Sequence, residues 1–286
     1  MNDLLPAHRA WIEEALTRLG ATAHGPAVAT KIRPWSSVGR IDTDRGRLWF
    51  KANEPALAFE AELLVVLAHA APGRVLKPLE RDPATGWFLL TDGGPTADGG
   101  DMATAEAITA IVEVQRAGAH RIDDAIRAGT PDRRPSVLRA VLDAAIAHPS
   151  SGVGGERCAA IRDRFVDGCA LLEADGRSTI VNADHKPAHL FRGPPLRIFD
   201  WGDAAVSHPL ADLPFIEREF GAAAAVQLLD AWGVGPSDAI VAAAGAAGEL
   251  IEADVWLRTS PEGLARHPDG IDVALGRLAD RIAASP

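Results

Sequence analysis

A glycine-rich stretch at residues 92–100 divides the sequence into two parts with different local patterns. The stretch is Asp92-Gly-Gly-Pro-Thr-Ala-Asp-Gly-Gly, whose glycines and proline predict a break in regular secondary structure. Short β-prone segments dominate before it, whereas apolar residues at helical spacing dominate after it. We therefore expect an α+β protein with a small antiparallel β-rich lobe at residues 1–92, a linker at 93–101 and a larger, mainly helical lobe at 102–286.

The first part begins with an amphipathic helix and continues with short strands. Apolar residues recur at helical spacing over residues 4–19, and Gly20 ends this run. A second helix is predicted at 53–70, because Asn53-Glu-Pro55 is typical of a helix start. We expect strands at 28–32, 38–43, 47–51, 75–79 and 87–90.

The second part consists almost entirely of predicted helices. They cover residues 103–119, 136–147, 156–174, 208–220, 222–232, 237–258 and 271–284. The exception is a segment in which two short apolar runs, 179–181 and 196–199, enclose a polar loop. These runs predict a β-hairpin embedded among the helices.

The composition limits the kinds of partner that we expect. The chain has 286 residues, of which 47% are hydrophobic, so it is long and apolar enough to bury a sizeable core. Its formal net charge of −10 argues against nucleic-acid binding, because phosphate backbones are bound chiefly by clustered Lys and Arg. No stretch reaches the roughly 18 uninterrupted apolar residues of a membrane span, and the N-terminus lacks the basic start of a signal peptide.

The two cysteines indicate a reducing compartment. Cys158 and Cys169 lie in one predicted helix, where a rise of about 1.5 Å per residue puts them roughly 16 Å apart, too far for a disulfide. Free cysteines are typical of cytoplasmic proteins. We expect a soluble cytoplasmic protein, monomeric or homodimeric, without a membrane or nucleic-acid partner.

Two polar segments carry the strongest functional signal. They are Asn182-Ala-Asp-His-Lys-Pro-Ala-His189 and Arg197-Ile-Phe-Asp-Trp-Gly-Asp203. Their order and spacing resemble the aminoglycoside phosphotransferase and choline kinase superfamily, which has H-G-D-x-x-x-x-N followed by an apolar run and D-W or D-F. The Asp-x-Lys-Pro part is also similar to the catalytic loop of protein kinases. The resemblance implies a bilobal protein-kinase-like fold that binds ATP and Mg²⁺ in a cleft.

The resemblance also implies roles for individual residues. Asp184 would orient the acceptor hydroxyl and take its proton, and Asp200 would bind Mg²⁺ against the nucleotide phosphates. Lys186 matches a lysine that approaches the transferred phosphate, with a plain surface lysine as the alternative. Asp203 would either add a carboxylate to the metal region or cap the next helix. Asp212 matches an aspartate that braces the catalytic loop.

Two positions depart from the family pattern. Asn182 stands at the place of the family's leading histidine, and His189 at the place of its metal-binding asparagine. Imidazole suits Mg²⁺ less well than an amide oxygen does. His189 would ligate the metal through nitrogen, hold a bridging water, or leave Asp200 as the remaining ligand.

An ion pair in the first part follows from periodicity alone. Lys51 ends a predicted strand, and Glu60 lies on the apolar arc of the next helix, whereas Glu62 lies at the edge of that arc. A carboxylate on a core-facing stripe is costly unless a cation meets it, so we expect Glu60 to pair with Lys51. Kinases use such a pair to hold nucleotide phosphates.

Two further segments are assigned to the nucleotide by their position. Ser36 and Ser37 lie in an expected turn between the first two strands, and their hydroxyls and backbone amides would reach the phosphates. An ordinary hairpin turn explains them equally well. Residues 89–93 would be the linker whose backbone meets adenine, with Asp92 among the nucleotide-binding residues.

We therefore predict an ATP-dependent phosphotransferase acting on a hydroxyl of a small molecule, with an antibiotic, as in resistance, or an amino sugar favoured. A catalytically silent pseudokinase that binds nucleotide or a partner is one alternative, motivated by Asn182 and His189. A kinase for choline or another amino alcohol is the other. Acidic residues of the C-terminal helices would bind amino groups, although solvated helix faces also account for them. The sequence contains no P-loop or zinc-binding motif, and its glycine pairs lack the context of a Rossmann fold.

Overall fold

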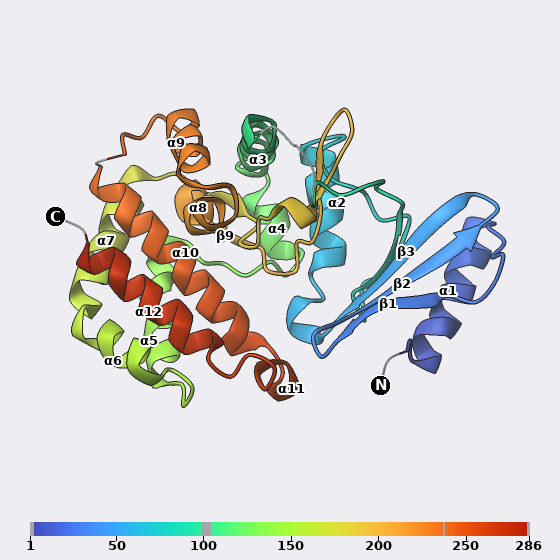
Figure 1. Ribbon diagram of the computed structural model, residues 1–286, viewed down its shortest axis with the longest axis horizontal. Helices are drawn as coiled ribbons and strands as arrows, with labels where there is room; N and C mark the ends of the chain where they lie inside the picture. The colour runs from blue at the N-terminus through green and yellow to red at the C-terminus, as the bar shows by residue number, and fades with distance from the viewer. Residues whose placement is uncertain (1–2, 99–103, 237, 285–286) are drawn as a thin grey trace.

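The computed structural model describes residues 3–98, 104–236 and 238–284, which form two lobes (Figure 1). The end of the predicted linker, residues 99–101, and the first residues of the predicted helix at 103 lie outside these ranges. The strands are β1 (Val28–Arg33), β2 (Ser36–Thr43), β3 (Gly46–Asn53), β4 (Glu80–Asp82), β5 (Trp87–Thr91), β6 (Thr179–Val181), β7 (Leu190–Phe191), β8 (Arg197–Ile198) and β9 (Ala205–Ser207). The α-helices are α1 (Pro6–Leu19), α2 (Glu60–Ala70), α3 (Thr104–Gly118), α4 (Ile122–Arg127), α5 (Pro135–Ala147), α6 (Gly152–Ala160), α7 (Arg162–Asp175), α8 (Leu213–Phe220), α9 (Ala222–Ala231), α10 (Ala239–Arg258), α11 (Pro261–Leu264) and α12 (Gly270–Ala283). Three short 3-10 helices are η1 (Pro55–Leu57), η2 (Pro187–His189) and η3 (Pro209–Asp212).

The small lobe is built on an antiparallel sheet in the order β1-β2-β3-β5-β4. The predicted strands at 28–32, 38–43, 47–51 and 87–90 are confirmed with shifts of a few residues at their ends. The predicted strand at 75–79 is wrong, because Pro78 has no N–H to donate to a strand ladder. Val75 forms an isolated bridge with Ile198, and the strand begins at Glu80 instead.

The turn between the first two strands is shorter than predicted. Ser36 and Ser37 do not lie in it, because both belong to β2 and pair with Asn53 and Ala52 of β3. The remaining β2 register runs without interruption to the turn at Gly46. Pairing to β3 therefore holds the backbone of Ser36 and Ser37 in the sheet.

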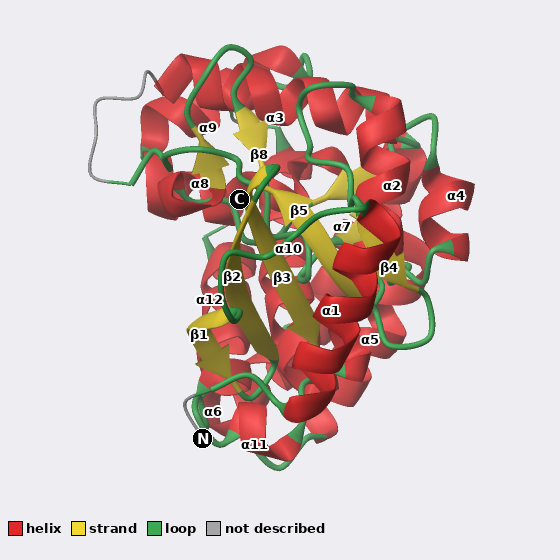
Figure 2. Ribbon diagram, turned by 90° about the vertical axis from the view of Figure 1, so that its right-hand side faces the viewer, coloured by secondary structure: helices red, strands yellow, loops and turns green. Residues whose placement is uncertain are grey.

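The two faces of this sheet pack against different helices. Alternate β3 residues, Leu48 and Phe50, join Ile12 and Leu16 of α1 in one buried cluster, and Figure 2 shows α1 lying against the sheet. The opposite face carries Lys51, and α2 packs there between the sheet and the large lobe. The sheet thus directs one row of side chains into a core and the other toward the cleft.

The large lobe is organised around α10, which contacts α5, α7, α8 and α12. Small residues let neighbouring segments approach α10 closely, since a Cβ added at Gly248 would come within 2.1 Å of the backbone oxygen of Ala211 in η3, and one added at Gly168 of α7 within 3.2 Å of the Cβ of Ala243. The alanine-rich composition of α10 therefore serves helix packing. No helix in the described part of the chain is long and apolar enough to span a bilayer.

Two predictions about the large lobe need correction. The predicted helix at 156–174 breaks at Ile161 into α6 and α7. Cys158 and Cys169 are free, as expected, and the structure buries both. The predicted hairpin is also wrong, because β6 pairs with β9, whereas β7 pairs with β8. Strands of two or three residues carry too little local pattern to specify their partners.

Candidate active site

An ion-pair network joins the two lobes at the cleft. Nζ of Lys51 on β3 lies 2.6 Å from Oε2 of Glu60 on α2 and 2.6 Å from Oδ1 of Asp200, which follows β8. The ion pair expected from the helical periodicity is therefore present. Glu62 instead pairs with Arg81 at the surface, at 2.5 Å.

The carboxylate of Glu60 is 1% exposed and fully hydrogen bonded. Oε2 accepts a hydrogen bond of 2.6 Å from Nδ2 of Asn53, and Oε1 accepts one of 2.9 Å from the backbone N–H of Trp201. Burial alone would lower the pKa of Lys51, but Asp200 and Glu60 raise it above its usual value. Burial likewise opposes ionisation of Asp200, but Lys51 outweighs it and lowers the pKa of that carboxyl. The pair of Lys51 and Asp200 thus favours the charged form of both side chains.

The loop after β6 presents Asp184 from a constrained backbone. Within the described ranges, Ala183 and Asp200 are the non-glycine residues with left-handed φ angles, 59° and 61°. Such conformations are costly and concentrate at functional sites. Asn182 ties the two segments together, because its Nδ2 donates to the backbone oxygen of Asp200 at 2.9 Å and its Oδ1 accepts from the N–H of Asp184 at 3.1 Å.

Asp212 holds the loop after β6 in place through hydrogen bonds. Its buried carboxylate accepts hydrogen bonds of 2.9 Å from the N–H of Ala183 and 2.9 Å from Nε2 of Gln115. Nε2 of His185 lies 3.0 Å from the same carboxylate. The structure thus gives Asp212 the bracing contacts that the resemblance implied.

Lys186 and Asp184 form a second ion pair in the site. Nζ of Lys186 lies 3.0 Å and 2.9 Å from the two carboxylate oxygens of Asp184. Both side chains are about one-third exposed and line the same cavity, so Lys186 faces the site and not the open surface.

His189 stands between the two aspartates. Its Nδ1 lies 3.0 Å from the backbone oxygen of Asp184, and its Nε2 lies 3.3 Å from Oδ2 of Asp200. Burial lowers the pKa of His189, which the nearby carboxylates oppose. The ring of Phe199 packs against the imidazole at 5.5 Å.

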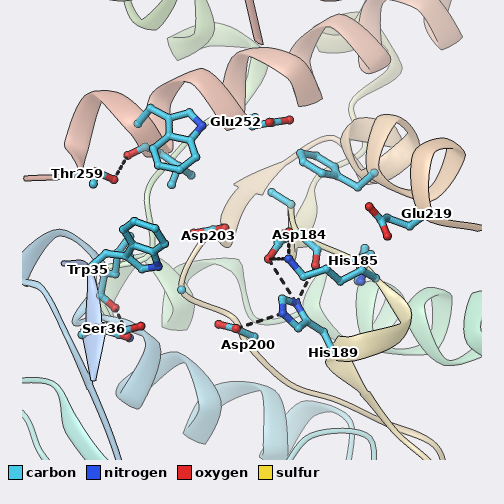
Figure 3. A pocket seen from close by; sticks show the side chains of 18 of the residues that line it. Trp35, Ser36, Asp184, His185, His189, Asp200, Asp203, Glu219, Glu252 and Thr259 are labelled. Carbon is cyan, nitrogen blue, oxygen red and sulfur yellow. Dashed lines mark hydrogen bonds and ion pairs between the residues drawn. The ribbon is translucent and has the colours of Figure 1, made fainter. Parts of the chain in front are cut away.

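Asp203 completes a group of three carboxylates. Figure 3 shows Asp184, Asp200 and Asp203 around one space. Burial, together with the charges of Asp184 and Asp200, raises the pKa of Asp203 well above its usual value. Within the described residues, its carboxylate has no hydrogen bond or ion pair. The alternative that Asp203 caps a helix is wrong, because strand β9 follows it.

Two cavities meet at this group. The first has a volume of about 430 Å³ and is mostly apolar, and its walls include Val38, Phe88 and Leu90 from the sheet. Phe191 and Phe199 form another wall with their rings stacked at 4.2 Å. A flat, largely apolar group fits between these walls.

The second cavity, of about 330 Å³, opens toward the helical lobe and is lined by charged as well as apolar side chains, and we call it the polar cavity. Asp184, Lys186 and Asp203 line it, with Trp35 from the small lobe and Trp256 from α10. Figure 3 labels Trp35, Asp184 and Asp203 around this cavity. Both cavities are lined by the same four junction residues: Lys31, Lys51, His189 and Asp200. Ligands bound in the two cavities would therefore meet at these four residues.

No protein-family model matches the sequence, and no curated protein matches it significantly. Solved structures do match: the GDP complex of wild-type aminoglycoside 2'-phosphotransferase-IIIa has 17% identity and a TM-score of 0.59, over 96% of this chain and 98% of that one. Spectinomycin phosphotransferase in complex with ADP and spectinomycin has 10% identity and a TM-score of 0.60, over 98% and 99%. A choline/ethanolamine kinase family protein from Mesorhizobium loti has 18% identity and a TM-score of 0.61, over 96% and 95%.

The chain has the fold of these phosphotransferases. The predicted α+β, bilobal, protein-kinase-like architecture is confirmed, and the predicted resemblance to this superfamily holds at the level of the fold.

The residues that were predicted to bind the nucleotide do not all line the same cavity. Asp92 lines the apolar cavity, where its Oδ1 accepts a hydrogen bond of 3.0 Å from the N–H of Gly94. Ser36 lines the polar cavity, whereas Ser37 is not among the residues that line either one. The structure therefore supports a ligand contact for Asp92 and Ser36 more directly than for Ser37.

Two contacts at the candidate site were not predicted from the sequence. Asn53 holds Glu60, and its spacing of two residues from Lys51 on one strand was the available signal. Trp35 packs at 6.1 Å against Trp256 from the other lobe, a contact that no local pattern indicates.

The acidic residues of the C-terminal helices are mostly neutralised by arginines. Glu249 pairs with Arg218 at 3.0 Å and with Arg277 at 2.7 Å, and Asp254 pairs with Arg133 at 2.9 Å. These acids stabilise the lobe. Glu219 and Glu252 do line the polar cavity.

Proposed function

We propose that the protein is a phosphotransferase that moves the γ-phosphate of ATP to a hydroxyl group of a small molecule. The observation that carries this proposal is the position of Lys51, Asp184 and Asp200 at the junction of an apolar and a polar cavity. Phosphoryl transfer needs a nucleotide and an acceptor on opposite sides of such a charged centre. The neighbours in complex with GDP and with ADP support a nucleotide ligand.

The apolar cavity would take the nucleotide. The base of the nucleotide would lie between Leu90 on the sheet side and Phe199. The protein backbone near Asp92 would run along the edge of the base. Lys51, held by Glu60, would bind the phosphates. In this proposal residues 1–92 form the nucleotide-binding lobe, 93–101 the linker and 102–286 the catalytic lobe.

Asp200, His189 and Asp203 would hold a divalent cation, Mg²⁺ in the family pattern. Within the described residues no group of three His, Cys, Asp or Glu side chains is placed to hold a metal ion alone, so phosphate oxygens of the nucleotide would complete the coordination. When bound, the cation would neutralise charge on the nucleotide phosphates.

Asp184 would act on the acceptor in the polar cavity. Its carboxylate would accept a hydrogen bond from the acceptor hydroxyl and then its proton, as the hydroxyl oxygen forms a bond to the γ-phosphorus. The bond from that phosphorus to the bridging oxygen breaks, and ADP leaves. Lys186, 2.9 Å from Asp184, would neutralise charge that accumulates on the transferred group.

The acceptor is proposed to be an antibiotic or an amino sugar, with an amino alcohol as the second candidate. Glu219 offers a carboxylate to an amino group at the cavity wall, and Trp256 offers an aromatic face, whereas Glu252 on the same wall is paired with Arg218 and Arg277 at 2.7 Å each. The structural neighbour in complex with spectinomycin supports an antibiotic, and the choline/ethanolamine kinase family protein supports an amino alcohol. Because both buried cysteines are free, we place the enzyme in the cytoplasm.

A phosphoryl-transfer screen tests the proposal. Purified protein is mixed with ATP or GTP, a divalent cation and one acceptor at a time, drawn from aminoglycosides, spectinomycin, hexosamines and amino alcohols, and nucleoside diphosphate release is followed. We expect release that depends on one acceptor class and yields a phosphorylated product. Nucleotide binding without transfer to any acceptor would favour the silent pseudokinase instead.

A further inference from the structure

Lysine is rare in this chain and is concentrated at the cleft. The sequence has 29 lysines and arginines, of which four are lysines, and three of these four line the polar cavity: Lys31, Lys51 and Lys186. Lysine presents a compact point charge that binds phosphate groups well, whereas arginine presents a planar fork. The transfer proposed above gives roles to Lys51 and Lys186 but none to Lys31.

The strand register places Lys31 on the cleft face of the sheet. Lys31 on β1 pairs with Val38 on β2, which in turn pairs with Lys51 on β3. Directly paired residues of neighbouring strands share one face of a sheet. The Cα atoms of Lys31 and Lys51 are therefore two strand spacings, or roughly 10 Å, apart on the face that lines the cavities.

An irregularity in β1 gives Lys31 this orientation. The register of β1 against β2 shifts between Ala29 and Lys31, so Thr30 is an extra residue in the pairing. Such a bulge redirects the side chains around it and is frequent next to active sites. Thr30 and Lys31 both line the apolar cavity, although adjacent residues of a regular strand point to opposite faces.

The charge of Lys31 is not neutralised by a protein carboxylate. Lys51 pairs with Asp200 at 2.6 Å and Lys186 pairs with Asp184 at 2.9 Å. The side chain of Lys31, in contrast, has no hydrogen bond or ion pair with residues 3–98, 104–236 and 238–284. Its charge still acts on the site: burial opposes ionisation of Asp200, but Lys51 and, to a smaller extent, Lys31 lower the pKa of that carboxyl. Lys31 therefore carries a charge that an anionic ligand can neutralise.

We propose that Lys31 binds the terminal phosphate of the nucleotide from the side of the small lobe. Lys31 lines both cavities, whereas Lys186 lines the polar one, so the two lysines border the junction from different lobes. A triphosphate whose base lies in the apolar cavity ends at this junction. Cations around the transferred phosphoryl group stabilise the charge of its transition state. This inference rests on the proposed function, because it concerns the phosphates that the function requires.

The alternative is a solvated lysine at the edge of the cleft, since Lys31 is exposed. The test compares Lys31→Met and Lys31→Arg with the unchanged protein and with Arg33→Met. Methionine keeps much of the side-chain length but removes the charge. Arg33 is the control, because it is exposed on the same strand and is not among the residues that line either cavity. Isothermal titration calorimetry in MgCl₂ gives the Kd for ADP and for an ATP analogue with an imido bridge between the β and γ phosphates.

We expect Lys31→Met to weaken binding of the ATP analogue about tenfold or more and binding of ADP less than about twofold, the scale of one charge-assisted hydrogen bond to the third phosphate. Lys31→Arg should keep most of the affinity, and Arg33→Met should change neither Kd. If Lys31→Met leaves the ratio of the two Kd values as it is in the unchanged protein, the inference is overturned and the proposed function stands. Failure of the unchanged protein to bind either nucleotide would overturn the proposed function as well.

Discussion

Nζ of Lys51 and Oδ1 of Asp200 lie 2.6 Å apart, although 149 positions separate the two residues in the sequence. One belongs to the sheet of the small lobe, and the other follows a strand of the large lobe. Both residues line both cavities, so the contact brings the candidate metal site next to the candidate phosphate site. The relative position of the two lobes is thus tied to the chemistry proposed for the cleft.

Replacing Glu60 by alanine should destabilise the protein and weaken nucleotide binding. The substitution removes one of the two carboxylates that contact Lys51 and leaves the buried N–H of Trp201 without its acceptor, which costs about 1–3 kcal/mol. Urea unfolding monitored by circular dichroism measures the change. Glu62→Ala is the control, because its ion pair with Arg81 lies at the surface and should contribute about 1 kcal/mol or less. Equal losses for the two variants would contradict the network described here.

Asp212→Asn should lower both stability and turnover. The amide NH₂ would face the N–H of Ala183 or the side chains that now donate to the carboxylate, which leaves buried donors unsatisfied at a cost of about 3 kcal/mol. Asp269→Asn is a suitable control, since Asp269 is exposed at the start of α12 and its side chain makes no capping bond. If Asp212→Asn unfolds like the control and keeps full activity, the bracing role is wrong.

The stability of the protein should fall between pH 7 and pH 4 because of His208. Burial lowers the pKa of His208 to about 4, below its usual 6.5, although the hydrogen bond to Asp175 opposes the shift. Between pH 6.5 and pH 4, His208 is therefore protonated in the unfolded state but neutral in the folded state. Its contribution to the free energy of unfolding is complete above pH 6.5 and is lost as the pH falls toward 4. The difference corresponds to at most about 3 kcal/mol.

Denaturant unfolding at a series of pH values measures this effect. His208→Asn keeps an acceptor for the N–H of Leu210, which now donates to Nδ1 at 3.2 Å, but removes the titrating group. Its stability should depend less steeply on pH over this range. Parallel profiles for the variant and the unchanged protein would show that other groups govern acid unfolding.

Alanine substitutions of two tryptophans should affect the binding of the acceptor and of the nucleotide separately. Trp256 lines the polar cavity, whereas Trp49 lines the apolar one. Trp256→Ala should raise KM for the acceptor that the screen identifies and leave the nucleotide Kd unchanged, while Trp49→Ala should do the reverse, each by about tenfold from the apolar area lost. The same pattern for both variants would mean that the cavities do not bind separate ligands.

The sequence was informative wherever a pattern was local. Glu60 was chosen over Glu62 because helical periodicity places one on the core and the other at its edge, and the contacts agree. Asp184 and Asp200 are predicted from two short motifs that resemble a known family, and the structure places both side chains around one space. Their convergence, however, does not come from the hairpin that was expected.

Contacts between distant segments could not be predicted in the same way. The pairing of β6 with β9 involves three residues on each side, which leaves almost no alternation to align. The contact of Trp35 with Trp256 depends on how the lobes meet, and the arginine partners of Glu249 come from two other helices. Tertiary packing decides such contacts, and single-sequence patterns do not encode it.

The most direct test of the account is the rate of phosphoryl transfer by Asp184→Asn, measured beside its nucleotide affinity. The variant keeps the shape of the side chain but removes the proton acceptor, so the transfer rate should fall by about 10²-fold or more while the nucleotide Kd stays nearly unchanged. An unchanged transfer rate, or a loss of nucleotide binding as large as the loss of rate, would contradict the placement of Asp184 at the acceptor hydroxyl.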